Sequence, residues 1–180
     1  MPEARNRSTL DRYFFASMAL LFVATAAIGF APNSVAIISG AKANPALIVH
    51  IHAAAMAAWL VLLATQALLV ALDKVHLHRR LGMTTAVLAP AIVVIMCVLA
   101  VSSFPGFESP RADAILVVQF KRIALFSLFC AWGFAARKTD RQAHKRLMLL
   151  ATFVVIDAAV NRMLFLPTLG FDSRLEFGFV

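Results

Sequence analysis

Residues 45–72 read PALIVHIHAAAMAAWLVLLATQALLVAL, a run without a single Asp, Glu, Lys or Arg residue. A helix needs about 20 mainly apolar residues to cross the hydrocarbon core of a bilayer. This run exceeds that length, so it predicts a transmembrane helix. A protein with one such helix is held at a lipid bilayer, so we expect the rest of the chain to lie in or beside lipid.

The composition supports a membrane protein. Of the 180 residues, 62% are hydrophobic and 14% are charged, whereas about a quarter of the residues in a soluble domain are charged. The net charge of +8 raises the question of nucleic-acid binding. The basic residues, however, form short clusters between apolar runs, which is the pattern that sets membrane topology. We therefore expect the lipid bilayer, and no nucleic acid, as a partner.

Further apolar runs predict an all-α, polytopic transmembrane helix bundle of about five spans, forming a single domain over residues 1–180. The first run has about 19 residues, longer than the roughly 7–15 of a signal peptide, and is expected to be retained. Pro90 should kink the third span without ending it. The expected spans are 13–31, 45–72, 81–104, 115–136 and 147–169.

The segments between the spans predict helix ends and loops. Asn44 and Pro45 are typical of a helix start, a capping residue followed by proline at the first helical position. Basic loops are expected at 73–80 and 137–146, and a proline-containing loop at 103–110.

Orientation follows from the basic residues. With the N-terminus inside, the basic loops and the N-terminal arginines place most of the 17 Lys and Arg residues on the inner side. Cytoplasmic loops of membrane proteins carry such an excess. The sequence thus predicts an inner-membrane protein with a cytoplasmic N-terminus and an external C-terminus.

A short motif occurs twice. His78-Arg79-Arg80-Leu81 and His144-Lys145-Arg146-Leu147 lie 66 residues apart, each at the expected inner start of a helix. The repetition predicts a duplicated helical hairpin, made by spans two and three and by spans four and five. Parallel repeats of this kind occur in transporters.

The same residues carry a family resemblance. The pattern H-x6-W-x6-Q begins at His52, HRRLG begins at His78 and HKRLMLL begins at His144. Together they resemble a family of uncharacterised bacterial multi-pass membrane proteins, catalogued as a domain of unknown function, over roughly residues 46–166. Relatives of this type often add helices at the C-terminal end. The resemblance implies membrane residence and no particular activity.

Polar residues inside the expected spans predict a site. His52, Trp59 and Gln66 are spaced by seven and share one stripe of the second helix. Polar groups on two further helices should reach the depth of His52 in the outer half of the bilayer. They are Gln119, Lys121 and Arg122 on the fourth helix and Asp157, Asn161 and Arg162 on the fifth.

An unpaired aspartate within the membrane costs about 2.5–3.5 kcal/mol, so Asp157 should have a basic partner. We expect that partner to be Arg122 first and Lys121 second.

Cofactor and metal sites have weaker support. Haem b with two histidine ligands needs them at equal depth on facing helices, and only His78 and His144 meet that condition. Each is followed by two basic residues, which favours an anchor at the water interface over a haem ligand. No metal site is expected. Cys97 and Cys130 lie at different depths, so a disulfide between them is not expected either.

Several functional hypotheses remain open. The outer polar layer could form a pocket for a quinone, a haem edge or a lipid head group, in a binding or redox-accessory protein. The same residues could instead lock helices together in a structural or scaffold subunit, with other subunits or a second copy as partners. A small transporter is a third hypothesis. Nucleophile, phosphate-loop and dinucleotide motifs are absent from the sequence, which argues against an enzyme.

Overall fold

The computed structural model describes the backbone of residues 2–104, 106 and 110–163, and the side chains of 13–104, 106 and 113–163. This part of the chain is all-α and contains six helices and no strand. The helices are α1 (Pro2–Ile38), α2 (Leu47–Ala71), α3 (Val75–Gly82), α4 (Thr85–Ser102), α5 (Pro110–Ala136) and α6 (Arg141–Val160).

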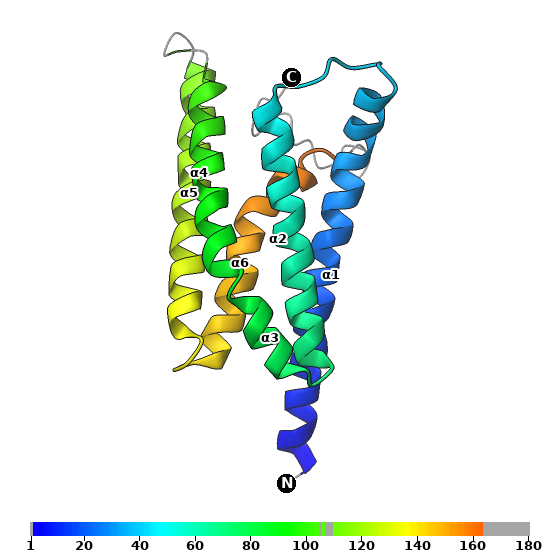
Figure 1. The fold of residues 1–180 in the computed structure, drawn as a ribbon, viewed down its shortest axis with the longest axis vertical. Helices are drawn as coiled ribbons and strands as arrows, with labels where there is room; N and C mark the ends of the chain where they lie inside the picture. Colours follow the sequence, from blue (N-terminus) through cyan, green and yellow to red (C-terminus); the bar gives the residue numbers. More distant parts are fainter. Residues whose placement is uncertain (1, 105, 107–109, 164–180) are drawn as a thin grey trace.

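The five long helices close into a ring. α1 packs on α2, α2 on α4, α4 on α5, α5 on α6, and α6 returns to α1. The short helix α3 crosses one end of this bundle and contacts α2 and α4 (Figure 1). Each long helix therefore packs on two other long helices, and the contact of α6 with α1 closes the ring.

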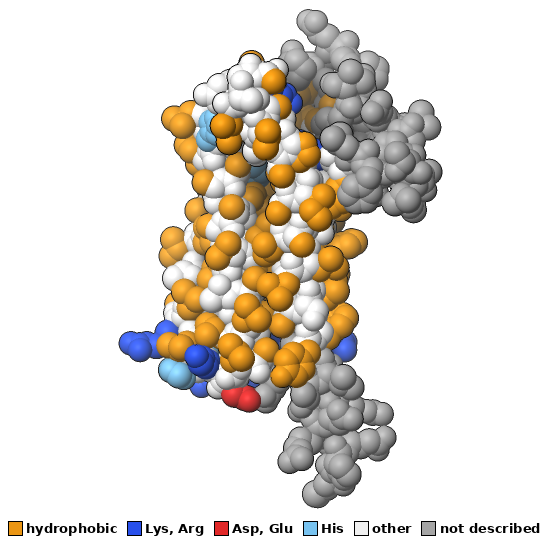
Figure 2. All heavy atoms as spheres, turned by 90° about the vertical axis from the view of Figure 1, so that its right-hand side faces the viewer, with side chains coloured by type: hydrophobic (Ala, Val, Ile, Leu, Met, Phe, Trp, Pro, Cys, Tyr) orange, Lys and Arg blue, Asp and Glu red, His pale blue; other side chains and the backbone are white. Residues whose placement is uncertain are grey.

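Four of the helices are long and apolar enough to cross a membrane, over Tyr13–Ile38, Leu47–Ala71, Thr85–Ser102 and Asp113–Ala136. Apolar side chains cover the middle of the face in Figure 2, and basic side chains gather at the lower end of that view. An apolar belt with charged ends is what a bilayer requires of a protein surface. The chain is thus a multi-pass membrane protein by the composition of its helices.

The expected fifth span differs from the observed helix. α6 begins at Arg141, six residues before the predicted start, and ends at Val160. The early start has a local cause: the Asp140 carboxylate accepts hydrogen bonds from the backbone N–H groups of Gln142 and Ala143, both at 2.9 Å. The basic loop is accordingly shorter than 137–146. Because α6 carries charged residues at both ends, it is not among the four apolar candidates, and residues 164–169 of the expected span lie outside the described residues.

Two predictions at the opposite end of the bundle were wrong. α1 continues through Pro32 to Ile38, past the expected end at Ala31. A proline removes one helical hydrogen bond, and a membrane helix tolerates that loss. Asn44 does not cap α2, which begins at Leu47 after Ala46 without a side-chain cap. The Asn44 amide oxygen instead accepts a hydrogen bond from the His50 ring, at 2.8 Å.

The segment predicted as the loop 73–80 also differs, because it contains most of α3. The two copies of the histidine motif therefore fold differently. His78 lies in this separate short helix, which ends before α4 begins at Thr85, whereas His144 lies in the first turn of the continuous helix α6. Both copies still lie at the same end of the bundle (Figure 1).

The core lies along the axis of the ring. Trp59 of α2, Ile92 of α4 and Phe126 of α5 are almost fully buried, and the Trp59 and Phe126 rings pack edge to face with centroids 5.1 Å apart. α6 enters this core at Thr152, which has no exposed surface. α1 and α6 pack closely at Gly29, where a side chain would overlap the backbone of Ala159. This close approach fixes the depth of the polar residues near the C-terminal end of α6.

Candidate functional site

An ion pair joins α5 and α6 in the layer that the sequence predicts. The Arg122 guanidinium donates to Oδ2 of Asp157 from Nε at 3.0 Å and from Nη2 at 2.5 Å. The expected pairing of Asp157 with Arg122 is thus present. The two partners are buried unequally: the Arg122 side chain is 10% exposed and the Asp157 side chain is 42% exposed. The arginine is held inside the bundle, and the carboxylate lies toward its surface.

Arg162 completes a group of charges around this pair. Its guanidinium lies close enough to interact electrostatically with Arg122, Asp157 and His52. One of its nitrogens donates to the Ala158 carbonyl at 2.6 Å, and its guanidinium lies 5.1 Å from the centroid of the Phe30 ring of α1. Arg162 therefore does not extend freely outward, because contacts with α1 and α6 hold it beside the ion pair.

Two buried polar atoms of this layer have no hydrogen-bond partner among the described residues. They are Nδ1 of His52 and Oδ1 of Asp157, the carboxylate oxygen that Arg122 does not use. A buried polar atom without a partner costs about 1–3 kcal/mol, and such atoms are uncommon in native proteins. The layer also has two guanidinium groups for one carboxylate. We call His52, Arg122, Asp157 and Arg162 the polar layer.

The polar layer offers hydrogen-bonding groups that suit the oxygen atoms of a ligand. Guanidinium groups donate to carbonyl, carboxylate and phosphate oxygens. Oδ1 of Asp157 accepts from a hydroxyl, and the imidazole of His52 donates or accepts according to its tautomer. The arrangement suits a ligand that has carbonyl or hydroxyl oxygens.

Other predicted site residues are not gathered into the polar layer. Lys121 is exposed on α5, next to the buried Arg122, and so lies on a different face of the helix. Asn161 follows the end of α6, where its backbone N–H donates to the Asp157 carbonyl. Gln119 is half-buried on α5, and among the described residues it forms no hydrogen bond with the ion pair.

Trp59 belongs to the core. Its indole N–H donates to the Thr152 hydroxyl at 3.0 Å, and both side chains are buried. The spacing by seven correctly places Trp59 on an inward face. The spacing does not reveal the depth at which the charged groups gather. His52 lies at that depth, and Trp59 lies at a different one.

Gln66, third in the same stripe, belongs to a second cluster at the other end of the bundle. Its amide oxygen accepts from the Gly82 N–H at 2.8 Å, and its amide nitrogen donates to the His78 carbonyl at 3.0 Å and to Nδ1 of the His78 ring at 2.5 Å. The buried glutamine thus fastens α3 to α2. The predicted stripe of His52, Trp59 and Gln66 placed Gln66 on the same face of α2 without indicating this partner.

The two motif histidines meet in this cluster, as their matching positions suggested. Their ring centroids are 6.3 Å apart with planes at 75°. The His144 ring donates from Nδ1 to the Gly133 carbonyl at 2.8 Å. Nδ1 of the His78 ring accepts a hydrogen bond from the Gln66 amide, so in the neutral ring the proton is on Nε2.

This tautomer bears on the haem hypothesis. A histidine ligand must present a lone pair to the metal, and the free nitrogen of neutral His78 carries a proton. The donor set therefore fits a hydrogen-bonded histidine pair better than two axial ligands of a haem. Within the described side chains, no group of three or more His, Cys, Asp or Glu residues could hold a metal ion, and Cys97 and Cys130 are free thiols.

Comparison with known proteins gives no family model, no curated protein and no solved structure that matches this chain.

Proposed function

We propose that this chain is a five-span membrane protein that binds the head group of a membrane-soluble ligand, an isoprenoid quinone or quinol, in its polar layer. One observation carries the proposal. His52 and Asp157 each bury a polar atom without a partner in the described chain, beside two guanidinium groups. A quinone supplies carbonyl oxygens for the cationic donors, and a quinol supplies hydroxyls for Asp157.

The membrane supports this choice of ligand. The polar layer lies in a bundle whose outer surface is apolar, so a ligand that arrives through lipid needs a small polar head and an apolar body. Isoprenoid quinones have this form. The bound molecule would make the protein a binding or redox-accessory component of a bacterial inner membrane, in keeping with its resemblance to the uncharacterised multi-pass family.

Quinone binding is tested directly on the purified full chain. Lipids extracted from the detergent-solubilised protein should contain quinone at a molar ratio well above that of the surrounding membrane. A short-chain ubiquinone should raise the thermal midpoint of the wild-type protein. His52→Gln should abolish that rise, whereas His50→Gln on the exposed face of the same helix should keep it.

Other results would reject the ligand. If the protein contains no quinone and the short-chain ubiquinone shifts neither the wild-type nor the His50→Gln midpoint, quinone binding is wrong. A Soret band in the absorption spectrum of the purified protein would instead identify haem as the cofactor.

A scaffold function is the second candidate, and the Arg122–Asp157 bond favours it. The bond ties α5 to α6 and satisfies one carboxylate oxygen completely. In a scaffold, replacing both partners with neutral residues would leave the protein stable and functional in cells. In a ligand-binding protein, the same double variant would be stable and would lose its ligand.

The orientation is part of the proposal and has its own test. Reporter fusions at Lys42, Lys74, Glu108, Asp140 and Asp172 should read outside, inside, outside, inside and outside. A cytoplasmic signal at Asp172 would contradict the fifth span and leave the four apolar spans alone.

A further inference from the structure

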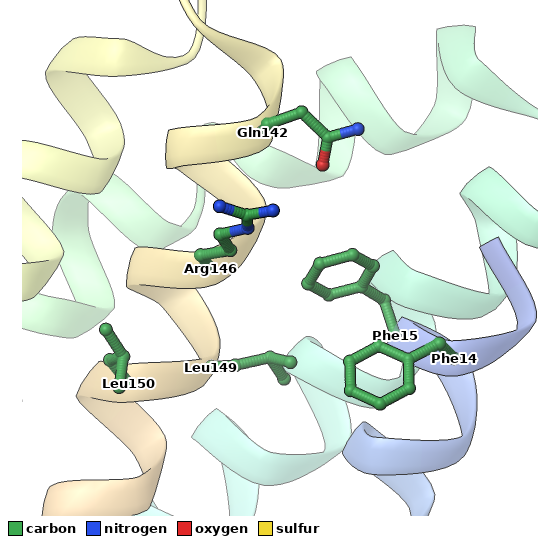
Figure 3. Close-up of a pocket in the computed structure, with 6 residues that line it drawn as sticks. All are labelled: Phe14, Phe15, Gln142, Arg146, Leu149 and Leu150. Atoms are coloured by element: carbon green, nitrogen blue, oxygen red, sulfur yellow. The ribbon is translucent and has the colours of Figure 1, made fainter. Parts of the chain in front are cut away.

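A groove lies between α1 and α6 at the end of the bundle that carries α3, far along α6 from the polar layer. It has a volume of about 390 Å³. Residues of two helices line it: Phe14 and Phe15 of α1, and Gln142, Arg146, Leu149 and Leu150 of α6. In Figure 3, Gln142 and Leu149 extend from α6 toward the two phenyl rings, and Arg146 lies between them along the helix.

The polarity of this groove changes along α6. Gln142 and Arg146 lie in the first two turns, next to the charged end of the bundle, and Leu149 and Leu150 lie one turn further in. From Arg146 to Leu150 the helix rises about 6 Å toward the apolar belt. The groove is thus polar where a lipid head group lies and apolar where an acyl chain begins.

The edge of the groove carries a positive charge, because Arg146 is exposed there. The Lys145 ammonium lies 4.6 Å from the centroid of the Phe15 ring. Basic pockets between membrane helices bind anionic lipid head groups, and a guanidinium matches a phosphate with two parallel hydrogen bonds.

We propose that this groove binds one anionic phospholipid, with its phosphate at Arg146 and one acyl chain along Leu149, Leu150 and Phe14. The groove opens on the lipid-facing surface, so lipid is the material that reaches it, and its positive edge selects anionic lipids over zwitterionic ones. Bound lipid bridges α1 and α6, the pair of helices that closes the ring. The site is separate from the polar layer and does not depend on the quinone proposal.

The test uses the full chain in a neutral detergent with dioleoyl phosphatidylglycerol or dioleoyl phosphatidylcholine added. Phosphatidylglycerol should raise the thermal midpoint of the wild-type protein, and native mass spectrometry should detect one retained molecule. Arg146→Gln should weaken this binding about five-fold or more, the effect of one basic residue near an anionic lipid. Arg146→Lys should give an intermediate loss, because it keeps the charge and loses the paired hydrogen bonds.

A matched control separates this site from general attraction. Arg80→Gln removes the same charge from the exposed surface of α3, outside the groove, and should keep the affinity of the wild-type protein. Equal losses in the two variants, or equal stabilisation by phosphatidylcholine, would overturn the proposal. Inorganic phosphate that reproduces the whole shift in midpoint would reduce the groove to an anion site and overturn the role of the acyl chain.

Discussion

The indole N–H of Trp59 donates to the hydroxyl of Thr152 at 3.0 Å, and the Thr152 hydroxyl donates in turn to the Met148 carbonyl at 3.1 Å. The bond crosses the centre of the ring from α2 to α6. Both side chains are buried, Trp59 at 2% and Thr152 at 0% exposure. Neither group has access to water, so each depends on the other.

Replacing Thr152 with valine should therefore be costly although the shape is conserved. The substitution leaves the indole N–H buried without an acceptor, which typically costs about 1–3 kcal/mol. Trp59→Phe in the same background removes the stranded donor. The thermal midpoint of the double variant should consequently fall by less than the sum of the two single losses. Strictly additive losses would contradict the bond.

The unequal burial of Arg122 and Asp157 predicts unequal losses. Asp157→Asn leaves the buried guanidinium without a counter-charge and should destabilise the protein by about 2–4 kcal/mol, below the full range for a buried pair because the carboxylate is partly exposed. Arg122→Gln leaves a half-exposed carboxylate and should cost about 1–2 kcal/mol. Chemical denaturation in mixed micelles measures both.

The double variant of this pair is its control. Asp157→Asn with Arg122→Gln should recover much of the loss of Asp157→Asn, since no unpaired charge remains. A double variant as unstable as the sum of both single variants would show that the two side chains do not stabilise each other.

The histidine pair predicts a dependence of stability on pH. Burial lowers the pKa of His78 below its ordinary value of 6.5, and the charges of His144 and Arg79 lower it further. The unfolded chain thus takes up a proton at a higher pH than the folded chain. The contribution of neutral His78 to the free energy of unfolding should be fully present above about pH 6.5 and should decrease as the pH falls below it.

Thermal midpoints measured between about pH 8 and pH 5 test this dependence. His78→Gln should flatten the acid side of the profile. His76→Gln, an exposed histidine of the same helix, should leave the profile unchanged. Identical profiles for the wild-type protein and His78→Gln would show that His78 does not cause the loss.

Gly29 predicts the effect of filling the contact between α1 and α6. A methyl group at this position would overlap the carbonyl oxygen of Ala159, and backbone atoms cannot turn aside as a flexible side chain can. Gly29→Ala should therefore lower stability by about 1–3 kcal/mol, the usual cost of overpacking. Ser34→Ala, exposed on the same helix, is the control and should leave the midpoint close to that of the wild-type protein.

The sequence by itself determined the four long, mainly apolar helices. The uncharged run 45–72 became α2, and the runs that contain Tyr13, Pro90 and Arg122 became α1, α4 and α5. Hydrophobic length decides such helices locally, because a backbone in lipid must satisfy its own hydrogen bonds. The pairing of Asp157 with Arg122 was also predictable, since an aspartate in lipid needs a cation and few were near its depth.

Tertiary structure alone decided the partners of the other polar residues of the bundle. Trp59 and His52 share a stripe in the sequence, yet Trp59 meets Thr152 in the core and His52 lies beside Arg162. The helix α3 was not predicted, because its basic sequence resembles a loop until Gln66 binds its backbone at His78 and Gly82. Spacing along a chain fixes the direction of a side chain on its own helix. The contacts it makes depend on how neighbouring helices are rotated and displaced, which packing at positions such as Gly29 and Ala159 sets.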